Sequence, residues 1–155
     1  MNSAISYYQI VDKLKETLEA NPSCNTVSYG DLHEVANDKT TMWPLAHFKV
    51  NSTELTERTY RFNMSLFVLD LIDHTNESAT DKFRGNDNIM DIHNTQLSVI
   101  TEAMLLFRRK EFRDLGYVLV GTPKFEAFTH NFDKDTAGWF CDFTVEVVMR
   151  MNVGC

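Results

Sequence analysis

The stretch MWPLAHFKVNSTELTERTYRFNMSLFVLDLID, residues 42–73, decides the fold of this chain. It contains two strand-like segments, MWPLAHFKV and YRFNMSLFVLDLID, joined by the polar segment NSTELTER. Over residues 61–65 polar and apolar residues alternate, which is typical of a strand with one solvated face. Over residues 66–69 every residue is apolar. We therefore expect a β-hairpin whose second strand is covered on both faces, by a helix on one and by helix, sheet or a neighbouring subunit on the other.

The length and composition indicate a single domain over residues 1–155 with a real core. The formal net charge is −7, from 22 acidic and 15 basic residues. This balance argues against a protein that grips nucleic acid, because such a protein needs a basic surface to neutralise phosphates. It is compatible with a protein that lets DNA pass without holding it, since an acidic surface repels phosphate.

Cysteine usage and targeting patterns indicate an intracellular place of synthesis. The three cysteines, at positions 24, 141 and 155, are too few and too scattered for a disulfide framework, and no CxxC pair suggests a zinc site. The first twenty residues lack the basic and apolar regions of a signal peptide. No apolar run reaches the ~18 residues of a membrane span. We expect a chain made and kept in a reducing cytoplasm.

The other elements follow from hydrophobic periodicity and turn residues. A wide apolar stripe over residues 87–109 predicts the longest helix, with Arg108, Arg109 and Lys110 at its negative end. The polar run 74–88 predicts a long loop. The expected order is a helix over 3–20, short strands within 25–36, the hairpin, the long helix, a short strand over 117–120, and a second hairpin over 124–132 and 139–149 with its turn at 133–138. We therefore predict an α+β fold: a mostly antiparallel sheet of two hairpins, with the long helix and the N-terminal helix packed on it.

A search for catalytic patterns indicates no active site. The five histidines form no HExxH motif, and there is neither a GxSxG motif nor a glycine-rich phosphate loop. Asp70, Asp73 and His74 could hold a hard cation or act as acid and base, but carboxylates at a strand end are more often solvated caps. We expect no catalytic residue, no metal and no cofactor, and hence no enzyme; a hydrolase with a His/Asp site is a weaker alternative.

The segment VSYGDLHEVANDKTTMWPLAHFKVNS, followed by YRFNMSLFVLDLID, resembles the tail-terminator and tail-completion (neck) proteins of tailed bacteriophages. The resemblance covers roughly residues 25–150. It implies a structural virion protein, made in the host cytoplasm, that forms a ring, usually a hexamer, at the head-proximal end of the tail or at the neck. The ring would end tail-tube growth and join tail to head, with the tail-tube protein and portal-side neck proteins as partners. Double-stranded DNA would pass through the bore, and the family has no active site to carry over.

Within that interpretation two regions are candidate contacts with a subunit or partner ring. The first is the loop 75–88, with Phe83 and Arg84 as apolar and cationic contacts. The second is the turn 133–139, with Asp133, Asp135 and an aromatic anchor at Trp139. Asp81 and Asp87 are predicted to face the bore. The alternatives are another neck or connector ring, and a small α+β adaptor that binds a small molecule or a peptide.

Overall fold

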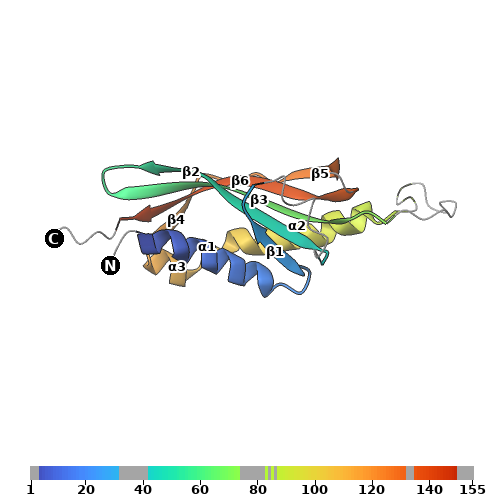
Figure 1. The fold of residues 1–155 in the computed structure, drawn as a ribbon, viewed down its shortest axis with the longest axis horizontal. Coiled ribbons are helices and arrows are strands. Elements are labelled where there is room, and N and C mark those ends of the chain that lie inside the picture. Colours follow the sequence, from blue (N-terminus) through green and yellow to red (C-terminus); the bar gives the residue numbers. More distant parts are fainter. Residues whose placement is uncertain are drawn as a thin grey trace.

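The computed structural model describes residues 4–31, 42–73, 83, 85, 87–131 and 135–149. It is an α+β fold, as predicted, with a sheet in one layer and the helices in the other (Figure 1). The elements in chain order are α1 (Ala4–Glu19), β1 (Thr26–Tyr29), β2 (Leu45–Leu55), β3 (Thr59–Leu71), α2 (Ile89–Leu106), α3 (Lys110–Asp114), β4 (Tyr117–Val120), β5 (Glu126–Asn131) and β6 (Thr136–Val148).

The sheet is mixed. Its strand order is β1-β2-β3-β6-β4, and β5 also pairs with β6. The two predicted hairpins, β2–β3 and β5–β6, are both antiparallel. β1, however, pairs with β2 in parallel, so the prediction of a mostly antiparallel sheet made of two hairpins is only partly right. The chain between β1 and β2, residues 30–44, is long enough for the crossover that a parallel pair requires.

The β2–β3 hairpin is longer than predicted. β2 continues through residues 51–55, so most of the segment expected to be a turn is strand, and the turn is confined to residues 56–58. The strand can continue because polar side chains do not interrupt the backbone hydrogen-bond ladder. The backbone N–H of Thr56 donates to the Thr59 carbonyl at 2.9 Å, and the N–H of Thr59 donates to Thr56 Oγ1 at 3.0 Å.

A register shift interrupts β2 between Val50 and Ser52. Val50 pairs with Met64 and Ser52 pairs with Asn63, so Asn51 is an extra residue, a β-bulge. The bulge exchanges the two faces of β2 from that point onward. Lys49 and Ser52, which an uninterrupted alternation would put on opposite faces, therefore lie on the same one.

The core lies between the helices and one face of the sheet. α1 buries Ile10, Leu14 and Leu18, and α2 buries Val99 and Ile100. The sheet contributes alternate residues of its central strands: Phe62, Met64, Leu66 and Val68 from β3, and Cys141, Phe143, Val145 and Val147 from β6. Period-two alternation thus puts these four residues of β6 on the core side of the sheet.

α2 ends three residues earlier than predicted. It stops at Leu106, and a separate short helix, α3, begins at Lys110. The break arises because Phe107 turns into the core against Phe112 and Phe143, while Arg109 takes an extended backbone with φ −67° and ψ 143°. Arg109 and Lys110 therefore begin a new helix and do not form the predicted basic end of α2.

The opposite face of β3 is covered within the chain at residues 67 and 69. Leu69 is fully buried in a second cluster with Leu45, and Phe67, Phe128 and Trp43 pack against this cluster. The predicted second cover of β3 is therefore supplied by side chains of β2, β5 and Trp43. A neighbouring subunit is therefore not needed to cover Leu69.

Candidate interaction surfaces

The polar side of the sheet forms one continuous surface, which we call the outer face. It consists of Lys49, Ser52, Glu54, Arg61, Asn63, Ser65, Asp142, Thr144 and Glu146. Period-two alternation in β3 and β6 brings these side chains together, since Arg61, Asn63 and Ser65 pair with Glu146, Thr144 and Asp142 respectively. The helices cover the other side of the sheet, so the outer face lies outside the helix layer (Figure 1).

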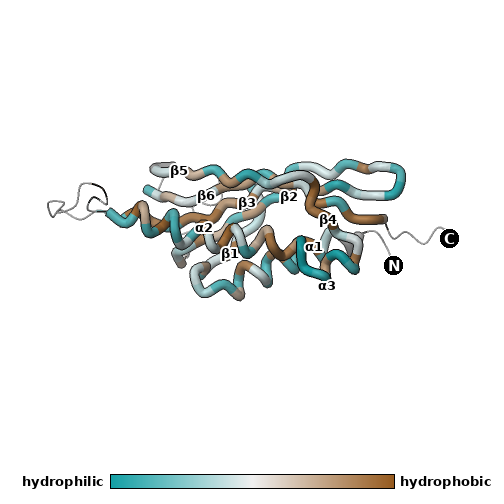
Figure 2. Tube along the Cα trace, turned by 180° about the vertical axis from the view of Figure 1, so that it is seen from behind, coloured by the Kyte–Doolittle hydropathy of each residue, from teal (hydrophilic) through white to brown (hydrophobic). Residues whose placement is uncertain are grey.

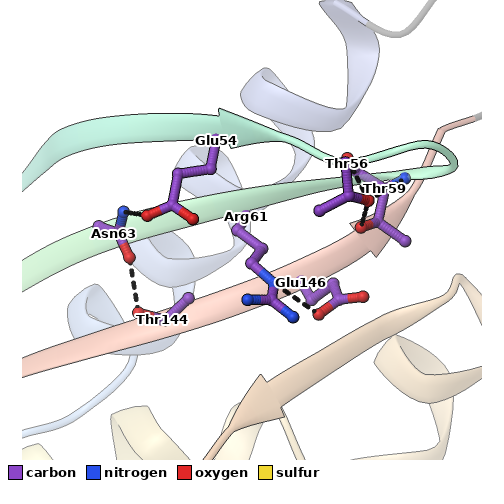
Figure 3. Close-up of polar contacts among 7 residues, drawn as sticks. All are labelled: Glu54, Thr56, Thr59, Arg61, Asn63, Thr144 and Glu146. Carbon is purple, nitrogen blue, oxygen red and sulfur yellow. Dashed lines mark hydrogen bonds and ion pairs between the residues drawn. The ribbon is translucent and has the colours of Figure 1, made fainter.

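Side chains on the outer face are tied to one another across three strands (Figure 3). Arg61 Nε donates to Glu146 Oε2 at 3.0 Å. Asn63 Nδ2 donates to Glu54 Oε1 at 3.0 Å, and Thr144 Oγ1 donates to Asn63 Oδ1 at 2.7 Å. Such exposed pairs stabilise the fold little, about 0–1 kcal/mol each, but they hold the side chains in a fixed pattern.

The cations of the outer face are engaged by carboxylates. Lys49 Nζ lies 2.9 Å from Asp31 Oδ1, and Arg61 is paired with Glu146. Glu54 accepts from Asn63 and Asp142 accepts from Ser65, and neither carboxylate forms an ion pair with a described residue. The outer face therefore presents amides, hydroxyls and carboxylates, and it offers a phosphate group no unpaired cation.

α2 carries an apolar groove on the side that faces away from the sheet. The lining residues of this α2 groove are Asn94, Leu97, Ser98, Thr101, Glu102, Leu105 and Arg109. Leu97 is 38% exposed and Leu105 is 46% exposed. Leu97, although apolar, is therefore not part of the buried side of this helix. The apolar side chains of α2 occupy more of the helix circumference than the sheet and α1 together can bury.

The end of the β2–β3 hairpin forms a second uncovered surface, the hairpin arm, residues 51–58. Every side chain of the arm is exposed. The arm lies at one end of the elongated molecule, past the start of α1, whereas α2 begins near the opposite end (Figure 1). Leu55, which is 68% exposed, is its large apolar residue.

β4 adds a smaller apolar edge. Val118 and Val120 project from the outward side of this strand, and Val118 is 57% exposed. Figure 2 shows apolar residues concentrated along β4 and the end of β6.

The residues that the sequence predicts to make contacts lie in different environments. Phe83 is 81% exposed, as a contact residue requires. Asp87 Oδ1 accepts from the Ile89 N–H at 3.1 Å, so this carboxylate serves the start of α2. The Asp135 carbonyl accepts from the Ile72 N–H at 2.9 Å. Asp81, Arg84 and Asp133 lie outside the described residues.

Trp139 lies inside β6 and not in a turn, because β6 begins at Thr136. Its Nε1 donates to the His93 carbonyl at 2.8 Å, and its ring packs edge-to-face on the His93 ring. His93 in turn donates from Nε2 to the Phe128 carbonyl at 3.1 Å. Trp139 is thus half-buried and attaches α2 to the sheet.

The titratable groups outside the outer face offer little reactivity. Burial raises the pKa of both Cys24 and Cys141 to about 11, so these thiols are protonated at neutral pH. Burial also raises the pKa of Asp70, although the Leu71 N–H donates to its carboxylate.

Among the described residues no group of three or more metal-ligating side chains gathers, and every buried side-chain nitrogen or oxygen has a hydrogen-bond partner. Within the same residues, no helix has the length and apolarity needed to cross a bilayer.

No protein-family model matches the chain, and no curated protein is similar to it in sequence.

Proposed function

We propose that this chain is a structural virion protein of a tailed bacteriophage, related in role to the tail terminators and tail-completion proteins that its sequence resembles. Copies of the chain form a ring, on the family pattern a hexamer, at the head-proximal end of the tail or at the neck. The ring stops growth of the tail tube and joins the tail to the head. Its partners are the tail-tube protein on one side and the portal-side neck proteins on the other.

The outer face is the observation that carries this proposal. It suits the wall of a bore through which DNA moves. A wall that held phosphates would retain the duplex, because each unpaired cation would release a counterion on binding. On the outer face Lys49 and Arg61 already have carboxylate partners, while Glu54 and Asp142 repel phosphate.

Two uncovered surfaces on different elements, each with an exposed leucine, support the ring itself. The α2 groove and the hairpin arm differ in shape and composition. Contacts between unlike surfaces are heterologous, and a repeated heterologous contact closes into a ring when its rotation permits.

Assembly is tested with the purified full chain by light scattering over a range of concentrations and by electron microscopy, alone and with the tail-tube protein of the same genome. We expect closed rings, and tubes that stop growing when capped. A chain that remains monomeric in both conditions contradicts the proposal and favours a monomeric adaptor.

The bore is tested by fluorescence anisotropy with a short duplex at physiological salt. We expect no binding by the assembled protein. Introducing unpaired cations with Glu54→Lys and Asp142→Lys should create binding that weakens as salt is raised. Tight duplex binding by the unmodified ring would contradict a bore lined by the outer face.

A further inference from the structure

We propose that the hairpin arm of one copy inserts Leu55 into the α2 groove of the next copy. This contact rests on the self-association that the proposed function requires, and it names the two surfaces that meet. It concerns one partner only, a second copy of this chain.

Leu55 points to the helix side of the sheet but lies beyond the helices. It pairs with Tyr60, whose ring stacks on Phe62 of the core at a centroid distance of 6.0 Å. Cross-strand partners share a face, so Leu55 faces the same way as the core residues. Its high exposure means that the described part of the chain leaves this side chain uncovered, at a place that a neighbouring molecule can reach.

The α2 groove presents two exposed leucines to an incoming apolar side chain. Leu97 and Leu105 are eight residues apart, which puts them about 12 Å apart along the helix, with Thr101 between them. A branched side chain placed over Thr101 would lie between the two leucines. Burying it there would favour each contact by removing this apolar side chain from water.

The charges around the two surfaces are complementary. Glu57 and Arg58 follow Leu55 in the arm, and Arg109 and Glu102 flank the groove. Arg109 makes no ion pair with any described residue. Glu102 uses Oε2 to accept from Asn21 at 2.7 Å, which leaves its other oxygen available. A neighbour's Glu57 can therefore meet Arg109 while its Arg58 approaches Glu102.

The positions of the two surfaces make the contact head-to-tail. The arm lies at one end of the molecule and the groove runs along α2 toward the middle (Figure 1). Each copy thus offers one arm and one groove, and each contact leaves an arm and a groove free at the two ends of the chain of subunits. A symmetric pair would instead use one surface twice.

The experiment uses two variants of the full chain and depends on the head-to-tail direction of the contact. Leu55→Asp disables the arm and keeps the groove. Leu105→Lys disables the groove and keeps the arm, and a lysine near the end of α2 is compatible with the helix dipole. Val118→Asp is the matched control, since it charges an apolar residue on β4 whose exposure lies between those of Leu55 and Leu105, outside both surfaces. Circular dichroism checks that all three fold.

We expect each arm or groove variant alone to lose the assembled species in light scattering, and Val118→Asp to retain it. An equimolar mixture of the two variants should give a 1:1 dimer that does not grow, because it contains one intact contact. Glu57→Arg should weaken assembly, and Arg109→Glu in the same chain should restore it.

Weak association is captured by mixing Leu55→Cys chains with Leu97→Cys chains in a Cys155→Ser background and oxidising them. The mixed disulfide dimer should form in excess over either homodimer. Assembly that the groove variant loses but the arm variant keeps would mean that α2 pairs with another surface, and would overturn the contact. Rings unaffected by either variant would overturn the contact and leave the proposed function standing. A chain that stays monomeric both alone and with the tail-tube protein, and that yields no mixed dimer, would contradict both.

Discussion

Gly138 of β6 lies directly against the backbone carbonyl of Val68 in β3. A Cβ atom at position 138 would be 1.9 Å from that oxygen and 2.8 Å from Leu69 Cα. Both neighbours are backbone atoms of the central strand, so neither can move aside as a flexible side chain would. The approach of the two longest strands at this point depends on the absence of a side chain.

Gly138→Ala should therefore prevent the β3–β6 pairing around Leu69 and cost about 3 kcal/mol or more. Denaturant unfolding measures the loss. Gly121→Ala is the control: no atom lies within 4 Å of its Cβ position, but its φ of +71° makes the substitution strained. Its cost should be about 1 kcal/mol. Equal stability of the two variants would contradict the close approach.

Trp139→Phe should destabilise the chain by about 1–2 kcal/mol, through loss of the hydrogen bond to the His93 carbonyl and of part of the ring. Hydrogen exchange should accelerate in the first turns of α2. Trp43→Phe is the control, because the other tryptophan packs against the Leu45–Leu69 cluster on the opposite side of the sheet. Unchanged exchange in α2 for the Trp139 variant would show that the indole does not anchor this helix.

Asp70→Asn should stabilise the protein at neutral pH. Because burial raises the pKa of Asp70 above its usual 3.8, its favourable contribution is complete below that value and is lost as the pH rises through the higher folded pKa. Asparagine removes the charge and keeps an oxygen for the Leu71 N–H. We expect a melting temperature slightly above that of the unmodified chain at pH 7 and equal to it at pH 3. A variant less stable at pH 7 would mean that the carboxylate is favourably placed.

Cys24 and Cys141 should resist iodoacetamide at pH 7.5 in the folded protein. Both are buried, and a pKa of about 11 leaves almost no thiolate. In a Cys155→Ser background, mass spectrometry should find both thiols unmodified until guanidinium is added. Modification of Cys141 in the native state at the rate of the unfolded chain would contradict its place in the core.

Local patterns predicted the elements with strong periodicity. The alternation in β3 and β6 indicated both the core set and the polar set that forms the outer face. The helical stripe of α2 was predicted, but its end was not, because the break depends on Phe107 finding space against Phe143, a residue far away in the sequence. The parallel pairing of β1 with β2 could not be predicted either, because local patterns do not specify which strands become neighbours.

The candidate contact surfaces were predicted less well. The sequence predicts a turn that extends to Gly138 and hence an aromatic anchor at Trp139, whereas Gly138 pairs with Leu69 inside β6. Leu55 and Leu105 were missed. Leu55 lies within a polar run, and Leu105 belongs to a stripe wider than its cover. Only the relative placement of sheet and helices reveals that both are uncovered.

The extra residue at Asn51 has a consequence for how the arm can vary among descendants of this chain. Inserting one residue beyond it would exchange Glu54 and Leu55 between the two sides of the sheet. The charged side chain would then lie on the helix side and the apolar one on the outer face. Inserting two would only make the arm longer. The arm can therefore lengthen by an even number of residues. An odd number is tolerated only where a second bulge restores the alternation of side chains between the two faces.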